Sequence, residues 1–219
     1  MPVEVPFLAD SEIEAAAKRL LTDYAHAKAP VGEPPVPIER ILGFLGLRQE
    51  MHDLYSLLNI ERDHDSELLG AICFNSKRVL VHEAIDPEKR SWLEGRYNFT
   101  LAHEVGHWVL HRRFFPDNSE QLSFLDNAVK PAIVCRKRED KHPIEIQANK
   151  FAAGLLMPAA LLAKAWKRRV EQGGNLSSAL RDEAIKATAK QFQCSLEATR
   201  YRLAALDLLG AGKSSDLAL

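Results

Sequence analysis

Apolar residues recur every three or four positions over most of the chain, and this spacing predicts a largely helical protein. The first such stretch covers residues 11–27, with Ser11 as its cap and its apolar side chains on one face. A proline-rich loop follows, and a second, shorter helix is expected over residues 38–45, ending at Gly46. Residues 47–68 mix polar and apolar side chains without a clear period, so they predict no particular element.

Two short apolar runs interrupt the helical pattern. Residues 69–74 and 78–82 read as strands, and the three polar residues between them, 75–77, suit a hairpin turn. A charged connection covers residues 83–95, and residues 112–142 are expected to be irregular. One hairpin among several helices predicts an α+β fold, in which a small sheet packs against a long helix.

The next helix is expected over residues 99–111, with Asn98 or Thr100 as its cap. Its core-facing stripe consists of Ala102, Val105, Gly106 and Val109. Glycine lowers helix propensity by about 1 kcal/mol relative to alanine. We therefore expect Gly106 to lie where this helix closely approaches the sheet.

A further helix is expected over residues 143–158. Pro143 suits the first position of a helix, and Pro158 suits its end. The core-facing side chains of this helix are Ile144, Ala148, Phe151, Ala152 and Leu155.

The C-terminal part of the chain predicts a helical appendage. Residues 182–192 and 196–209 read as two helices, the second capped by Ser195, in the order of a helix-turn-helix. Their expected core is Ile185, Ala189, Phe192, Leu196 and Leu203. Arg200 and Arg202 could meet DNA phosphates, but acidic neighbours dilute this patch, so direct DNA binding is not favoured.

Composition and charge narrow the function only slightly. The chain has 219 residues, a formal net charge of −1 and three cysteines without a metal-binding or disulfide spacing. A nearly neutral chain gives no global reason to bind nucleic acid or a membrane. The N-terminus lacks a secretion signal, and the longest apolar tract, residues 151–163, is too short to span a bilayer. We therefore expect a cytoplasmic protein.

Residues 103–107, His-Glu-Val-Gly-His, carry the strongest chemical signal. Two histidines four positions apart on a helix lie on one face, roughly 6 Å from each other, and can bind one zinc ion. Glu104 would face the same site, where a carboxylate can take a proton from a water molecule that the metal activates. Because this pattern is a metalloprotease signature, we expect His103 and His107 as zinc ligands and Glu104 as the catalytic base.

A catalytic zinc site needs a third protein ligand, and two residues are candidates. His111 continues the series, but on an unbroken helix it lies about 12 Å along the axis from His103. We expect it to be a partly exposed histidine at the helix end, not a ligand. Glu145 could complete a His-His-Glu site, or it could simply favour the positive end of the helix dipole. Asn149, one turn later, could accept a hydrogen bond from a liganding imidazole.

Two further residues have weaker claims to the site. Tyr97 is close in sequence and could stabilise an oxyanion, although a packing role is the simpler interpretation. The thiolate of Cys135 could cap the open zinc position, although a small residue in a solvated loop is the simpler interpretation.

The two blocks that carry these residues resemble the ImmA/IrrE-type metallopeptidases. The resemblance rests on residues 96–107 and on residues 144–158, where Ala-Asn-Lys-Phe-Ala and Leu-Leu-Met-Pro follow the glutamate. It extends to residues 30–37 and 192–203. It implies a zinc cofactor whose ligands are His103, His107 and Glu145, with Glu104 as the base.

The order of elements agrees with this resemblance. A hairpin, a His-Glu-x-x-His helix and a glutamate-bearing helix are typical of a zincin-like core, which we place at residues 1–175, with the helical appendage at residues 176–219. An extended peptide would pair with an edge strand beside the zinc helix. The resemblance implies an endopeptidase that cleaves a helix-turn-helix repressor or an antitoxin-like regulator. The alternative is a regulator that binds DNA or a partner and whose metal site is not catalytic.

Overall fold

The computed structural model describes residues 5–62, 67–115, 133–136, 142–173 and 178–209 of the 219-residue chain. Its helices are α1 (Asp10–Ala27), α2 (Ile38–Phe44), α3 (Leu54–Leu58), α4 (Glu94–Gly106), α5 (Pro143–Leu156), α6 (Ala159–Gly173), α7 (Ser178–Phe192) and α8 (Leu196–Ala205). Its strands are β1 (Arg48–His52), β2 (Leu68–Cys73), β3 (Arg78–His82) and β4 (Ile133–Arg136). Together they form a mixed α+β fold, as the sequence predicted.

The strands form one sheet in the order β1-β3-β2-β4. β2 and β3 pair antiparallel, which confirms the predicted hairpin. β1 runs parallel to β3, and β4 runs antiparallel to β2. β1 lies in the stretch that predicted no element, and β4 lies in the stretch expected to be irregular, so the latter expectation was wrong. Whether a segment forms a strand depends on the strands beside it in the fold. The partners of β1 and β4 are β3 and β2, which lie far from them in sequence.

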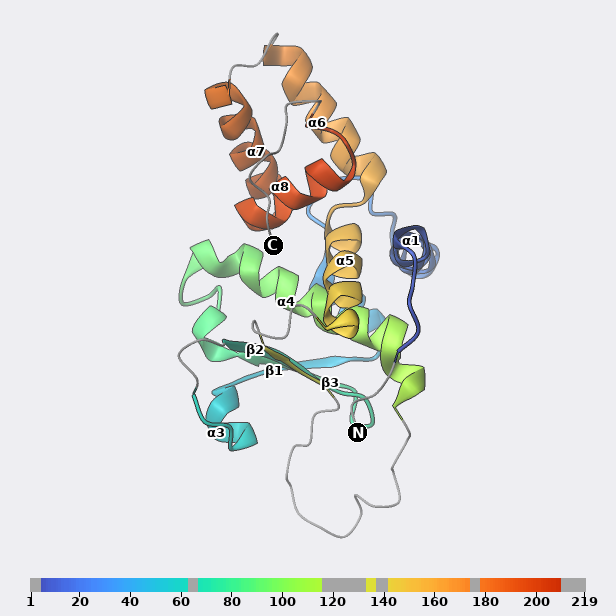
Figure 1. Cartoon of the computed structure of the whole chain (residues 1–219), viewed down its shortest axis with the longest axis vertical. Coiled ribbons are helices and arrows are strands. Elements are labelled where there is room, and N and C mark those ends of the chain that lie inside the picture. The colour runs from blue at the N-terminus through green and yellow to red at the C-terminus, as the bar shows by residue number, and fades with distance from the viewer. Residues whose placement is uncertain (1–4, 63–66, 116–132, 137–141, 174–177, 210–219) are drawn as a thin grey trace.

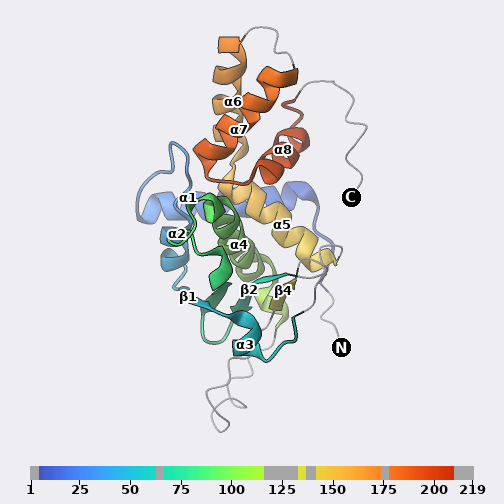
Figure 2. The ribbon, with the colours of Figure 1, turned by 90° about the vertical axis from the view of Figure 1, so that its left-hand side faces the viewer.

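The elements form layers around α4. This helix lies across one face of the sheet, α5 packs on its far side, and α1 lies beside α5 (Figure 1). The view turned by 90° again places α4 between the sheet and α5 (Figure 2). α6, α7 and α8 gather at the end of the molecule away from the sheet in both views. One large apolar core joins the layers and draws on helices and strands alike.

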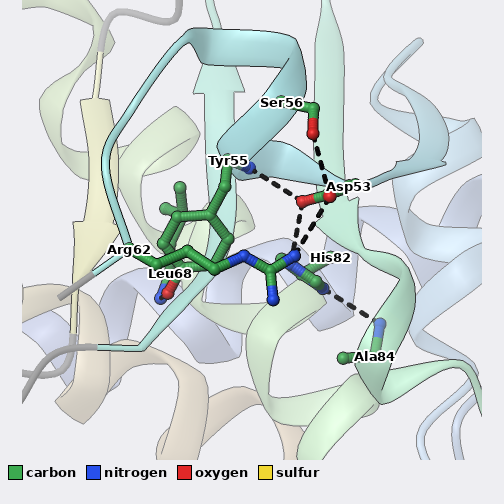
Figure 3. A network of polar contacts seen from close by, with 7 residues as sticks. All are labelled: Asp53, Tyr55, Ser56, Arg62, Leu68, His82 and Ala84. Atoms are coloured by element: carbon green, nitrogen blue, oxygen red, sulfur yellow. Dashed lines mark hydrogen bonds and ion pairs between the residues drawn. The ribbon is translucent and has the colours of Figure 1, made fainter. Parts of the chain in front are cut away.

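The opposite face of the sheet is covered by α3, over a smaller cluster of apolar residues: Leu54, Leu68, Ala71, Cys73 and Leu80. A polar network holds this short helix in place (Figure 3). Asp53, its N-cap, accepts hydrogen bonds from the backbone N–H of Tyr55 at 3.1 Å, from Ser56 Oγ at 3.0 Å and from Arg62 Nη2 at 3.1 Å. The Tyr55 hydroxyl in turn accepts from the N–H of Leu68, which fastens α3 to the start of β2.

Three predicted helix caps were wrong. α1 begins at Asp10, so Ser11 lies inside the helix. α4 begins at Glu94, so both Asn98 and Thr100 lie inside it. The charged connection before α4 already contains a 3₁₀ turn that leads directly into the helix, which explains the early start.

The C-terminal end of the predicted α4 stripe also differs from expectation. Ala102 and Val105 are buried, but Val109 is 38% exposed. The helix changes to a π-helical turn after Gly106, which rotates the following residues relative to an α-helix. Gly106 itself faces α5 instead of the sheet: a Cβ there would lie 3.2 Å from the Cα and the carbonyl oxygen of Ala148.

The two C-terminal helices lie close to their predicted positions. Ser195 caps α8 by accepting a hydrogen bond from the N–H of Ala198, as predicted. Of the expected core, Ile185, Ala189, Phe192 and Leu203 are buried, whereas Leu196 is 37% exposed. Leu196 is the first residue of α8, where it faces outward, so its assignment to the core was wrong.

Both arginines that the sequence suggested as contacts for DNA phosphates bind other residues of the protein. Arg200 forms an ion pair with Asp182 at 2.8 Å. Arg202 is buried; its Nε donates to the carbonyl of Met157 at 3.0 Å, and its Nη2 contacts Glu14 Oε1 at 2.6 Å. Arg202 therefore fastens α8 to α1 and to the end of α5.

Among the residues that the structure describes, no single helix is long and apolar enough to cross a bilayer; only α5 and the adjoining part of α6, bent by 58°, pass that criterion together.

Gly95 gives a testable measure of how tightly α4 packs against the turn between α7 and α8. A Cβ at Gly95 would lie 2.7 Å from the carbonyl carbon of Cys194 and 2.8 Å from the backbone nitrogen of Ser195. Because backbone cannot move aside as a side chain can, Gly95→Ala is expected to lower the free energy of unfolding by about 1–3 kcal/mol. Urea denaturation measures this change.

The matched control is Gly43→Ala. Gly43 lies in α2, and a Cβ there meets nothing within 4 Å. Removing a helical glycine at this position should raise the free energy of unfolding by up to about 1 kcal/mol. An unchanged stability for Gly95→Ala would show that the α7–α8 turn does not press on α4.

Candidate metal centre

α4 and α5 cross so that two histidines and one glutamate face one another. His103 of α4 and His107, one turn later at the start of the π-helical turn, place their Nε2 atoms 2.9 Å from each other. Glu145, in the first turn of α5, lies 3.0 Å from His103 Nε2 through Oε2 and 3.5 Å from His107 Nε2 through Oε1. The three residues are 0–3% exposed, and their donor atoms all lie within 4.8 Å of one another, a group that could hold a metal ion.

The hydrogen bond on the far side of His103 shows why this group suits a cation. His103 Nδ1 lies 2.9 Å from Asn149 Oδ1, an oxygen that only accepts, so the ring donates from Nδ1. In a neutral ring the lone pair is then on Nε2, which points at Glu145 and at the other imidazole. Nitrogen lone pairs and a carboxylate converging on one buried point are a donor set that Zn²⁺ binds. The residues present therefore fit a metal ion.

Glu104 lies beside this cluster and is fully buried. Neither of its carboxylate oxygens has a hydrogen-bond partner among the residues that the structure describes. Burial raises the pKa of Glu104 to about 8. The electrostatic interaction with His103 opposes this rise, and the nearby Glu145 carboxylate adds to it. A buried carboxyl group with an elevated pKa and no protein partner is suited to exchanging a proton with a bound molecule.

The pKa values of the cluster itself shift in the directions that metal binding requires. Burial alone would raise the pKa of Glu145, but its close contacts with the imidazoles of His103 and His107 outweigh burial and lower the pKa. Burial lowers the pKa of His107 to about 3, and the neighbouring His103 contributes in the same direction. An ionised carboxylate and a neutral imidazole are the forms that bind metal.

The elevated pKa of Glu104 predicts how the stability of the metal-free protein depends on pH. A carboxyl group whose pKa is higher in the folded chain than its ordinary 4.5 stabilises the fold fully below that value. This contribution is lost as the pH rises toward about 8, where the folded protein must ionise the group. Glu104→Gln has no such group, so its unfolding free energy relative to wild type should increase as the pH rises through this range. Denaturation in a chelator measures the difference, and a difference independent of pH would contradict the burial of an ionisable Glu104.

The sheet reaches the cluster at Gly70 of β2. A Cβ at this position would lie 2.5 Å from Glu104 Oε1 and 2.7 Å from Thr100 Cγ2. The sheet and α4 can therefore approach this closely only because residue 70 has no side chain. The close approach that the sequence analysis assigned to Gly106 occurs at Gly70 instead.

The structure corrects the expectation for His111. This histidine is fully buried, because the π-helical turn over His107–His111 carries it inward. Its Nδ1 lies 3.0 Å from His107 Nδ1, and its Nε2 lies 3.0 Å from Gln147 Oε1. Burial lowers the pKa of His111, and the hydrogen bond with Gln147 partly offsets this. His111 is therefore placed behind the candidate ligand His107, outside the group that could hold an ion.

Two other predicted site residues are placed differently. Tyr97 is buried on α4, but its hydroxyl donates to Glu39 Oε1 of α2 at 2.6 Å, and burial together with this bond raises its pKa. The hydroxyl is thus engaged with α2, and the oxyanion role gains no support from this placement. The backbone of Cys135 lies in β4, but its side chain, expected as a possible cap on the metal, lies outside the described residues.

Gln147 and Gly70 were missed in the sequence. A polar residue between the apolar positions of α5 is one signal for Gln147, and a glycine inside an apolar strand is the signal for Gly70. Neither signal says which distant residue will be the partner.

Comparisons with known proteins identify a family and a similar fold. No curated protein matches the chain. A solved structure of similar fold, described as a Mycobacterium tuberculosis transcriptional regulator, superposes with a TM-score of 0.51 at 16% sequence identity. The match covers 89% of this chain but only 46% of that protein, and at this identity it concerns the fold alone.

A family model for the M78 peptidases, described as an IrrE N-terminal-like domain, matches residues 89–204, more than half of the chain. The matched range contains both helices of the centre, α4 and α5. The family agrees with the resemblance found in the two sequence blocks. The chain therefore belongs to the M78 peptidase family of proteins with an IrrE N-terminal-like domain.

Proposed function

We propose that this protein is a zinc-dependent endopeptidase. The observation that carries the proposal is the convergence of His103, His107 and Glu145 beside a buried Glu104 whose carboxylate has no partner among the described residues. A structural metal site has no need for such a carboxylate, whereas hydrolysis of a peptide needs a proton acceptor next to the metal. The supporting context is membership of a peptidase family.

Each side chain has a defined task in this proposal. His103, His107 and Glu145 would hold the ion, and Asn149 would orient His103. When bound, zinc would supply a Lewis acid that polarises the peptide carbonyl and makes water more acidic. Glu104 would take a proton from the attacking water and pass it to the leaving amine. Burial of Glu104 supports this task, since a carboxyl group with a pKa near the working pH both accepts and returns a proton.

We further propose a zincin-like core at residues 1–175 that receives its substrate as an extended strand. β4 is an edge of the sheet among the described strands, next to β2, whose Gly70 touches Glu104. An extended peptide that adds to an edge strand is positioned through its main chain, with little demand on side chains. This mode of binding suits cleavage of a regulatory protein at an exposed segment.

The proposed substrate is a helix-turn-helix repressor or an antitoxin-like regulator, whose cleavage would relieve repression. The support comes from the family, since ImmA/IrrE-type sequences resemble this chain in both site blocks. We assign residues 176–219 as a helical, helix-turn-helix-like appendage that docks on the core or on the substrate. Direct DNA binding is disfavoured because Arg200 and Arg202 both contact the protein itself.

Co-expression with a repressor encoded beside the gene tests the proposal. Mass spectrometry should find two repressor fragments that share one new terminus, and metal analysis of the purified protein should find zinc. The fragments should be absent when Glu104→Gln replaces the wild type. A repressor that remains intact, together with a DNA shift by the purified protein in a gel, would support the alternative of a DNA-binding regulator with a non-catalytic metal site.

A further inference from the structure

Behind His107, on the side away from Glu145, lies a chain of buried polar groups. His107 Nδ1 lies 3.0 Å from His111 Nδ1, and His111 Nε2 lies 3.0 Å from Gln147 Oε1. Gln147 Nε2 donates to the main-chain carbonyl of Pro6 at 2.9 Å. Both histidines are fully buried and Gln147 is 4% exposed, so these groups depend on one another and not on bulk water.

The carbonyl at the far end gives every hydrogen bond in this chain a direction. A carbonyl oxygen only accepts, so the amide nitrogen of Gln147 must face Pro6 and its Oε1 must face His111. Oε1 also only accepts, so His111 carries its proton on Nε2. In a neutral ring the lone pair of His111 is then on Nδ1, and His107 must donate to it from its own Nδ1.

This direction decides which nitrogen of His107 can bind a metal. A neutral histidine that is protonated on Nδ1 has its lone pair on Nε2, the atom that faces His103 and Glu145. We propose that the main-chain carbonyl of Pro6, acting through Gln147 and His111, fixes the proton of His107 on Nδ1 and so keeps Nε2 available to a metal ion. The effect of this proton position on metal affinity rests on the proposed function. His111 and Gln147 are positioning residues, since neither belongs to the group that could hold the ion.

The N-terminal segment is anchored well enough to act in this way. Val5 and Leu8 pack against the main core on either side of Pro6. Asp10, at the start of α1, forms an ion pair with Lys150 of α5 at 2.6 Å. The hydrogen bond from Gln147 to the Pro6 carbonyl places this segment against α5. A segment far from the metal motif in sequence therefore supplies the fixed acceptor that orients one of its ligands.

The two liganding imidazoles are held by different devices. His103 donates directly to Asn149, whose position one turn after Glu145 on α5 is local to the site. His107, by contrast, is connected through two side chains, His111 and Gln147, to the carbonyl of Pro6 in the N-terminal segment. Metal affinity should therefore respond to Gln147, a residue with no contact to the ion.

Histidine tautomers in the metal-free protein test the proposal directly. Long-range ¹H–¹⁵N correlation spectra of the wild type should show His111 protonated on Nε2 and His107 protonated on Nδ1. In Gln147→Met, which has similar length but no donor and only a weakly accepting sulfur, both rings should become tautomeric mixtures. The zinc dissociation constant, measured by competition with a chromogenic chelator, should rise about 10–100-fold in this variant. Pro6→Ala keeps the carbonyl and should leave both readouts at wild-type values.

The outcomes separate this inference from the proposed function. A wild-type His111 protonated on Nδ1 would overturn the inference without any variant, and so would a Gln147→Met protein with wild-type tautomers. Equal zinc affinity in wild type and Gln147→Met would also overturn it. Failure of the wild type to bind zinc would refute the proposed function, and the tautomers of the same metal-free sample would still uphold or overturn the inference.

Discussion

Glu104→Gln is expected to lower the rate of substrate cleavage by about 10²–10⁴-fold, the usual contribution of a positioned general base. Glutamine has nearly the shape of glutamate, but its amide neither takes a proton from water nor returns one to a leaving amine. Because Glu104 is not one of the three groups that could hold the ion, the zinc content should stay that of the wild type. The appearance of repressor fragments over time measures the rate, and atomic absorption measures the zinc.

Glu183→Gln is the matched control for this variant. This variant makes the same glutamate-to-glutamine replacement on α7, where the Glu183 side chain is 69% exposed and pairs with Lys186. Its cleavage rate should equal that of the wild type. Cleavage by Glu104→Gln at an undiminished rate would show that Glu104 is not the general base of the reaction, whatever the zinc content.

Gly70→Ala should lower the cleavage rate by about 10²-fold, the order of loss that a misplacement of about 1 Å at a reacting group can cause. The new methyl group would overlap Glu104 Oε1 and Thr100 Cγ2, which lie 2.5 and 2.7 Å from its position. Glu104 is fully buried, so its carboxylate has no solvent into which it can turn, and the sheet and α4 must separate instead. The three candidate ligands lie on α4, the π-helical turn after it and α5, not on the sheet, so the zinc content should fall much less than the rate.

Two measurements distinguish this effect from general unfolding. The urea midpoint of Gly70→Ala should show that the protein is still folded under the assay conditions. Gly43→Ala, which adds the same methyl group where nothing lies within 4 Å, should cleave at the wild-type rate. An active Gly70→Ala enzyme would mean that the position of the Glu104 carboxylate is not critical for the reaction.

Much of the site could be predicted from local spacing alone. The i and i+4 positions of an α-helix share a face, so the pentapeptide 103–107 was enough to pair two imidazoles and place a carboxylate next to them. The apolar stripe from Ile144 to Leu155 was equally local, and all of its predicted members are buried. The hairpin of β2 and β3 followed from two apolar runs and a short polar turn.

The errors in the sequence analysis lie where one segment meets another. The sequence left open whether Glu145 is a ligand or a helix-dipole residue, and only the tertiary structure places its carboxylate 3.0 Å from His103 Nε2. His111 was expected at a solvent-facing helix end, but the π-helical turn and Gln147 bury it. The glycine needed for close approach to the sheet proved to be Gly70 and not Gly106, which faces α5.

The difference between what the sequence predicted and what it missed has a physical origin. Backbone geometry repeats every 3.6 residues in a helix and every two in a strand, so a sequence determines by itself which side chains share a face. It determined here that His103, Glu104 and His107 lie close together on one helical segment. Packing decided the rest, because the energy of bringing Glu145, Gly70 or the Pro6 carbonyl to that helix comes from contacts across the whole core. The proton position on His107, and with it the readiness of the site for metal, belongs to this second class.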